Sequence, residues 1–233
     1  MKAADTKKES TKSMPLKNKA MNILFDLDGT ITDPMLGITN SVMYALKRYG
    51  IVVEDRRELY KFIGPPLAES FSRYYGFSES EGHELVKVYR EYFSDKGLYE
   101  NEVYEGIEDM LKTLKGEGHK IYLATSKPQV YAKRILQHFL LDKYFDGIVG
   151  SELNGDRVEK SAVITYLLGK YSLADAIMVG DRCFDIMGAK ENGLASIGVL
   201  YGYGEKDELK NVGADFLAES VEDLKKILLN LGR

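Results

Sequence analysis

Residues 23–30 constrain the chain most, because the run Ile-Leu-Phe-Asp-Leu-Asp-Gly-Thr joins an apolar segment to two acids and a glycine. An apolar run this short is typical of a strand that is buried on both faces of a sheet. Gly29 breaks the strand directly behind Asp26 and Asp28, so both carboxylates can point into one crevice beyond the strand's carboxyl end. Open α/β sheets bind their ligands at this place.

Two carboxylates this close repel each other, and a fold that keeps them together needs a reason. One reason is a divalent cation such as Mg²⁺, which prefers carboxylate oxygens and completes its shell with phosphate and water. Another is a division of labour, in which one acid is an ionised nucleophile and the other a protonated general acid. The alternative without chemistry is a turn in which Asp28 bonds its own backbone and Gly29 takes a positive φ.

The segments beyond residue 105 alternate between short apolar runs and helical periodicity. This alternation predicts an α/β fold with a doubly wound parallel sheet. We expect its strands at residues 23–25, 119–124, 147–149, 176–179 and 196–200.

Residues 35–104 show helical spacing and no convincing strand, with helices expected near 38–49, 54–62, 67–75 and 81–93. We therefore expect a helical domain at residues 35–104, inserted into a core domain that consists of residues 21–34 and 105–233. Nine tyrosines lie between Tyr44 and Tyr104. Their spacing favours packing inside a small bundle over stacking on a nucleobase.

Polar groups also follow two later strands. Thr125 and Ser126 come after the strand at 119–124 and before an expected helix, where a hydroxyl and a backbone N–H suit a phosphate oxygen, although they equally suit a helix N-cap. Asp181 ends the strand at 176–179, and Asp185 falls on the first turn of the next helix. A helix N-terminus alone explains Asp185, whereas a buried Asp181 without a partner would be costly in the absence of a cation.

Lys160 is expected to begin a helix, where the macrodipole favours acids rather than bases. A phosphate bound beside Asp26 would account for a lysine at this place. Arg157 and Lys127 are the alternatives for the same task, because helix boundaries drift by a few residues in single-sequence predictions.

These segments resemble the four motifs of the haloacid dehalogenase superfamily of hydrolases. The likeness is closest to its phosphoglycolate phosphatases and 5′-nucleotidase-like phosphatases. It extends from Ile23 to about Gly204, and the motifs at 26–30 and 180–185 are the specific ones. The helical insertion occupies the position of the cap in this branch. The family often follows its motif lysine with proline, whereas this chain has Ser161, so Arg157 and Lys127 stay open.

The resemblance implies a mechanism and a role for each motif residue. Asp26 would be the nucleophile that forms an aspartyl phosphate, and Asp28 the general acid and base. The implied phosphate-binding residues are Thr125, Ser126 and Lys160. The implied Mg²⁺-binding residues are Asp26, Asp28, Asp181 and Asp185.

The resemblance also implies the reaction, which is hydrolysis of a small phosphorylated metabolite, with nucleoside 5′-monophosphates and 2-phosphoglycolate as the leading substrates. Members that cleave carbon–halogen bonds or phosphonates lack an acid at the position of Asp28. Sugar-phosphate mutases grip a second phosphate with a basic cap loop, whereas residues 63–67 are uncharged here. A mutase, a pyrophosphatase and, from a different class, a receiver-like phosphorylated signalling domain remain as alternatives.

The composition sets the remaining expectations. The chain has 233 residues and a net charge of −4. This slight acidic excess does not favour binding to nucleic acids or to membrane surfaces. The single cysteine, Cys183, fits a reducing compartment, and we expect a cytoplasmic monomer. Residues 1–20 are rich in Lys, Ser and Thr, and we expect a disordered tail there.

Overall fold

A computed structural model describes residues 20–232, so the expected disordered tail lies outside the described residues apart from Ala20. The strands of the core form one six-stranded sheet in the order β5-β4-β1-β6-β7-β8, and every pairing in it is parallel. The predicted doubly wound parallel sheet is thus confirmed. The strands are β1 (Asn22–Phe25), β4 (Lys120–Pro128), β5 (Gly147–Ser151), β6 (Ile177–Gly180), β7 (Ala195–Val199) and β8 (Phe216–Ala218).

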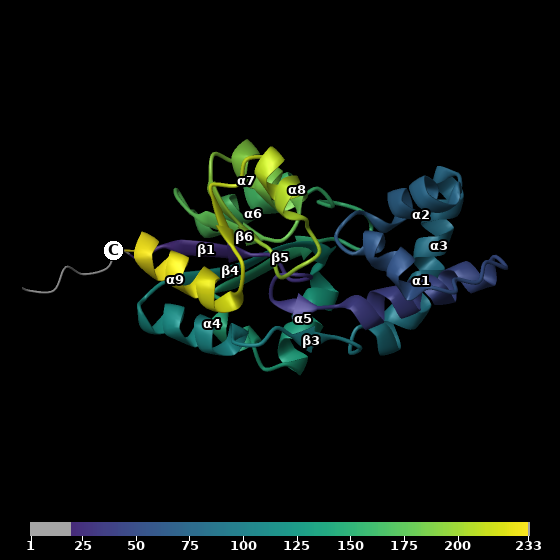
Figure 1. The fold of residues 1–233 in the computed structure, drawn as a ribbon, viewed down its shortest axis with the longest axis horizontal. Coiled ribbons are helices and arrows are strands. Elements are labelled where there is room, and N and C mark those ends of the chain that lie inside the picture. The colour runs from purple at the N-terminus through teal and green to yellow at the C-terminus, as the bar shows by residue number, and fades with distance from the viewer. Residues whose placement is uncertain (1–19, 233) are drawn as a thin grey trace, which may run out of the picture.

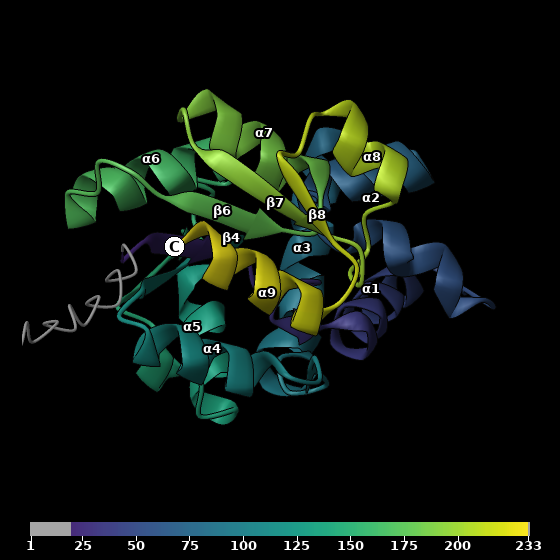
Figure 2. The same ribbon diagram turned by 60° about the vertical axis from the view of Figure 1, so that its left-hand side comes forward.

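Helices cover both faces of this sheet (Figures 1 and 2). One face carries α4 (Ile107–Gly116), α5 (Gln129–His138) and α9 (Val221–Leu231), and the other carries α6 (Lys160–Tyr171), α7 (Cys183–Glu191) and α8 (Lys206–Asn211). A short 3₁₀ turn, η3 (Asp142–Tyr144), follows α5. The apolar run of β1 serves both layers, because Ile23 and Phe25 join one buried cluster and Leu24 joins the other. This double burial is the reason why the strand has no polar face.

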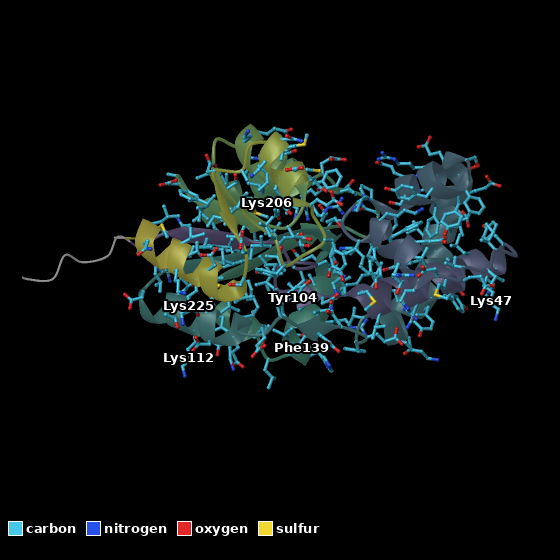
Figure 3. All side chains as sticks on the ribbon, viewed as in Figure 1. Lys47, Tyr104, Lys112, Phe139, Lys206 and Lys225 are labelled. Atoms are coloured by element: carbon cyan, nitrogen blue, oxygen red, sulfur yellow. The ribbon has the colours of Figure 1, made fainter. Side chains whose placement is uncertain are left out.

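The helices that precede α4 leave the core between two very short strands, β2 (Thr32–Asp33) and β3 (Glu102–Val103), which pair antiparallel. These helices are α1 (Met35–Arg48), η1 (Arg56–Phe62), α2 (Leu67–Tyr75), α3 (Glu79–Tyr92) and η2 (Phe93–Gly97), and we call them the helical insertion. Figure 1 shows the insertion at one end of the molecule, and Figure 3 marks it with Lys47, while Lys112 and Lys225 mark the opposite end. Our expectation of no strand within 35–104 is wrong at β3, since two residues are too few for a visible pattern.

Other boundaries differ from the expected ones for local reasons. The segment near 54–62 forms the 3₁₀ helix η1, which begins after Asp55, whose side chain accepts the N–H of Arg57. The helix expected from residue 81 begins at Glu79, because Ser78 and Glu81 form a capping box. The helix α8 and the strand β8 were not expected from the sequence.

Candidate active site

Two strand ends bring the acids of the motifs together. Asp26 follows β1 and Asp181 follows the neighbouring β6. Gly29 has a φ of +81°, and a Cβ on it would lie 2.1 Å from Oδ2 of Asp181. A Cβ on Gly180 would lie 2.2 Å from Cγ of Asp185. Both glycines are therefore needed to let carboxyl groups approach the backbone, in addition to the turn that Gly29 makes.

Three buried acids, Asp26, Asp181 and Asp185, each offer a carboxylate oxygen, and these oxygens lie within 4.8 Å of one another. A set of hard oxygen donors at the end of a parallel sheet suits Mg²⁺, which commonly binds one or two carboxylates and leaves room for phosphate and water. The side chain of Asp28 is not part of this group, because it turns toward Lys127.

Lys160 is the first residue of α6, as predicted, and its ammonium lies among the acids. Its Nζ is 2.8 Å from Oδ1 of Asp26 and 2.8 Å from Oδ1 of Asp185, and it donates a hydrogen bond of 3.0 Å to the carbonyl of Ala124. Burial opposes the charged form, but the two carboxylates outweigh it and raise the pKa of Lys160 above its usual value. The lysine is therefore a permanent cation inside the site.

The other two candidate cations occupy different places. Arg157 pairs with Glu152, and its guanidinium carbon lies 4.2 Å from the ring centre of Tyr166. Lys127 pairs with Asp28 instead of Asp26, with 2.7 Å between Nζ and Oδ2. Of the three, Lys160 is the one that contacts Asp26.

Burial makes two of these acids, Asp185 and Asp181, reluctant to ionise. It raises the pKa of Asp185 to about 6, against the opposing charge of Lys160. It raises the pKa of Asp181 well above the ordinary range, and the neighbouring Asp185 and Asp26 add to the effect. Lys160 pairs with two of the three carboxyl groups, so full ionisation leaves an excess of negative charge that a divalent cation would offset.

Asp181 is nevertheless hydrogen-bonded. Its Oδ2 accepts the backbone N–H of Tyr203 at 2.8 Å, and its Oδ1 accepts the hydroxyl of Thr30 at 3.5 Å. Our expectation that a buried Asp181 would lack a partner without a cation is therefore wrong. The number of converging acids, and not an unpaired oxygen of Asp181, is therefore what favours a cation at this site.

The pair between Asp28 and Lys127 was not expected from the sequence. The Lys127 side chain is only 6% exposed, and its Nζ lies 4.7 Å from the ring centre of Phe93, which belongs to the helical insertion. Burial raises the pKa of Asp28, although Lys127 acts in the opposite direction. Nothing in the sequence indicated this pair, because β4 was expected to end at residue 124 and its register shifts between Thr125 and Pro128.

Thr125 and Ser126 lie beside this pair, but in a different backbone setting from the one expected. β4 continues to Pro128 and α5 begins at Gln129, so neither residue belongs to the first turn of a helix. The hydroxyl of Thr125 accepts the backbone N–H of Lys127 at 3.3 Å. The carbonyl of Ser126 accepts the hydroxyl of Ser151 at 2.7 Å.

A cleft of about 1030 Å³ opens over these groups and is lined from both sides. The core contributes six of the seven residues that we predicted for the site, all except Asp181. The helical insertion contributes the 63–67 loop, from Gly64 to Leu67, and parts of α2 and α3. The loop is uncharged as expected, but α2 and α3 add Arg73, His83, Lys87 and Arg90 to the same wall. The uncharged loop therefore does not by itself exclude a second phosphate.

Tyrosines contribute little to this cleft. Among the nine between Tyr44 and Tyr104, Tyr89 is the one that is fully buried and the one that lines the cleft. Its ring stacks on Phe93, with 5.2 Å between the ring centres. Several others pack partly buried against the insertion's core, as expected.

Comparisons with known proteins agree with this geometry. The model of the haloacid dehalogenase-like hydrolase family matches residues 23–199. A 5′-nucleotidase from Pseudomonas aeruginosa is 52% identical over 191 residues, which cover 81% of this chain and 86% of the relative. The tyrosine-protein kinase PtkA from Mycobacterium tuberculosis is 33% identical over 210 residues, which cover 88% of this chain and 72% of the relative.

A solved structure gives the same picture. The crystal structure of a predicted phosphatase from Clostridium acetobutylicum superimposes with a TM-score of 0.89 at 49% identity, covering 91% of this chain and all of the other. Fold and site thus define a hydrolase whose acids cluster at the carboxyl edge of a parallel sheet. The chain belongs to the haloacid dehalogenase-like hydrolase family, and within it the chain is a phosphatase. No helix in residues 20–232 is long and apolar enough to cross a membrane.

Proposed function

We propose that this phosphatase is an Mg²⁺-dependent phosphomonoesterase that acts on a small phosphorylated metabolite through an aspartyl phosphate. The observation that carries the proposal is the setting of Asp26. This buried carboxyl lies 2.8 Å from the ammonium of Lys160, and its oxygen is within 4.8 Å of those of two further acids at the end of a large cleft.

In the first step, a carboxylate oxygen of Asp26 bonds to phosphorus while the bond from phosphorus to the leaving oxygen breaks. Asp28 donates its proton to that oxygen, and its raised pKa favours the protonated form that this task needs. In the second step, Asp28 takes a proton from water, which attacks the phosphorus and releases Asp26 and inorganic phosphate.

The surrounding residues bind and orient the phosphoryl group. Thr125, Ser126 and Lys160 would hold its other oxygens. The side chains of Asp26, Asp181 and Asp185 would hold Mg²⁺, together with the backbone carbonyl of Asp28, and the ion would supply positive charge that offsets the phosphoryl oxygens.

The substrate is proposed from the cleft and from the relatives. We propose that residues 35–104 act as a cap domain whose 63–67 loop faces the leaving group. We also propose that the protein acts in the cytoplasm. The relative named 5′-nucleotidase supports a nucleoside 5′-monophosphate, with 2-phosphoglycolate as the other leading substrate. A mutase or pyrophosphatase stays as an alternative, since basic residues of α2 and α3 line the same cleft. A receiver domain would have no use for a cleft of about 1030 Å³.

The Asp28→Asn variant tests the proposal. An alkyl phosphate needs a proton on its leaving oxygen, so its turnover should fall by about 10²–10⁴-fold. p-Nitrophenolate leaves without a proton, so p-nitrophenyl phosphate should give a burst of product and a protein whose mass increases by one phosphoryl group, with the label on Asp26. Asp26→Asn is the matched control and should give no burst. Label on another residue, or full activity in excess EDTA, would refute the proposal.

A further inference from the structure

In the sequence, Arg182 lies between two acids of the site, Asp181 and Asp185. Its side chain extends away from them to the 63–67 loop, which joins two helices of the insertion. Its Nη1 donates a hydrogen bond of 2.6 Å to the carbonyl of Ile63, which begins the 63–67 loop. Its Nε donates a hydrogen bond of 3.0 Å to Glu208 on α8. The side chain is only 18% exposed. One guanidinium thus joins the loop to the core.

The backbone of the loop is shaped around this guanidinium. Gly64 has a φ of +105°, a conformation that favours glycine, and a Cβ on it would lie 3.0 Å from Nη1 and 3.1 Å from Cγ of Arg182. The loop therefore rests directly on the arginine stem. The backbone of Arg182 is held by the acidic cluster. Its N–H donates a hydrogen bond of 3.1 Å to Oδ2 of Asp185.

We infer that Arg182 is a positioning residue that holds the 63–67 loop over the cleft and thereby selects the substrate. Gly64 and Leu67 line the same cleft as Asp26. The inference rests on the proposed function, in which Asp26 receives the phosphoryl group of a substrate bound in this cleft. An arginine suits this task, since its planar fork donates in two directions at once, whereas a single ammonium cannot satisfy the Ile63 carbonyl and Glu208 in the same geometry. A displaced loop changes the wall that faces the leaving group and leaves the phosphate site in place.

The test compares Arg182→Gln with Arg134→Gln, a control on α5 whose guanidinium binds the hydroxyl of Tyr99, 3.1 Å away. We expect kcat/KM for the best metabolite substrate to fall about 10–100-fold more than kcat/KM for p-nitrophenyl phosphate, which is the range for loss of a charge-assisted hydrogen bond. Hydrogen exchange at the amides of Ile63 and Ser70, which flank the loop and donate to the carbonyls of Tyr60 and Pro66 at 3.0 Å, should become faster in Arg182→Gln and stay unchanged in the control.

A second variant separates the two contacts of the arginine. Glu208→Gln keeps the bond to Ile63 and removes only the ion pair, so its effects should be smaller than those of Arg182→Gln. Unchanged exchange in Arg182→Gln, or an equal loss with both substrates, overturns the inference. A wild-type protein without turnover on any phosphate ester refutes the proposed function instead, and the exchange rates then still decide whether Arg182 holds the loop.

Discussion

Replacing Lys160 by Met removes one buried ammonium and keeps an apolar side chain of similar length. In the wild type this ammonium is 2.8 Å from Asp26 and 2.8 Å from Asp185, and the lysine is 5% exposed. The substitution removes the positive partner of two buried carboxyl groups, those of Asp26 and Asp185, beside the third acid Asp181. We therefore expect Lys160→Met to destabilise the metal-free protein strongly, even though it makes no cavity.

The size of the effect follows from the distances. At 2.8 Å and an effective dielectric constant of 20, each of the two ion pairs has a gross Coulomb energy of about 6 kcal/mol. The cost of burying the ammonium offsets much of this gain, and breaking a buried pair typically destabilises by about 3–5 kcal/mol. For a chain of this size that loss corresponds to a decrease in Tm of roughly 6–20 °C.

Thermal unfolding in EDTA and in Mg²⁺ measures the effect. Mg²⁺ should raise the Tm of Lys160→Met by more than it raises that of the wild type, because the ion replaces the missing positive charge. Lys170→Met is the control, since this exposed lysine lies on the same helix and should change stability by no more than about 0.5 kcal/mol. A Lys160→Met protein as stable as the wild type in EDTA, or one that gains nothing extra from Mg²⁺, would refute the reasoning.

Two further predictions concern stability away from the acids. Gly37→Ala should destabilise by about 1–3 kcal/mol in urea, because the new Cβ would lie 1.9 Å from the carbonyl oxygen of Gly97, where α1 meets η2. Gly169→Ala in α6 is its control and should be neutral or slightly stabilising, since a Cβ there meets nothing within 4 Å; equal losses in both variants would contradict this account. The second concerns His119, whose Nδ1 accepts the N–H of Met21 and whose pKa burial lowers below 6.5. Because the unfolded chain takes up a proton that the folded chain resists, His119 makes stability fall as the pH decreases through about 6.5. His119→Asn keeps an acceptor, so the loss of unfolding free energy between pH 7.5 and 5.5 should shrink in this variant, and an unchanged loss would show that His119 does not contribute.

Patterns that extend over many residues allowed most of the fold to be predicted from the sequence. The alternation of apolar strands and helices predicts the parallel sheet, and the run before Asp26 predicts a strand buried on both faces, which β1 is. The shortest elements gave no such signal. β2 and β3 have two residues each and β8 has three, so their pairing depends on neighbours that are distant in the chain.

The candidate acids could also be predicted, because Asp26 and Asp181 each follow a strand of a parallel sheet whose carboxyl ends share one edge, and Asp185 lies on the first turn of the helix after β6. That logic names Asp26, Asp181 and Asp185 and the helix start at Lys160, although their roles stay predictions. It cannot name the partners of a side chain that leaves the sheet. The contacts of Lys127 with Asp28 and Phe93 could not be predicted from the sequence. They depend on the directions of two side chains and on how η2, the last helix of the insertion, packs against the core.

The sequence by itself thus determined the parallel sheet without its edge strand β8, the polar residues that follow its strands, and the presence of a helical insertion. Only the tertiary structure decided how the insertion meets the core. The bond from Arg182 to the Ile63 carbonyl spans 119 residues of chain, and the hydrogen bond that satisfies Asp181 comes from Tyr203, 22 residues later. Periodicity reports which face of an element is buried, whereas hydrogen bonds between a side chain and a distant backbone atom depend on how separate elements pack.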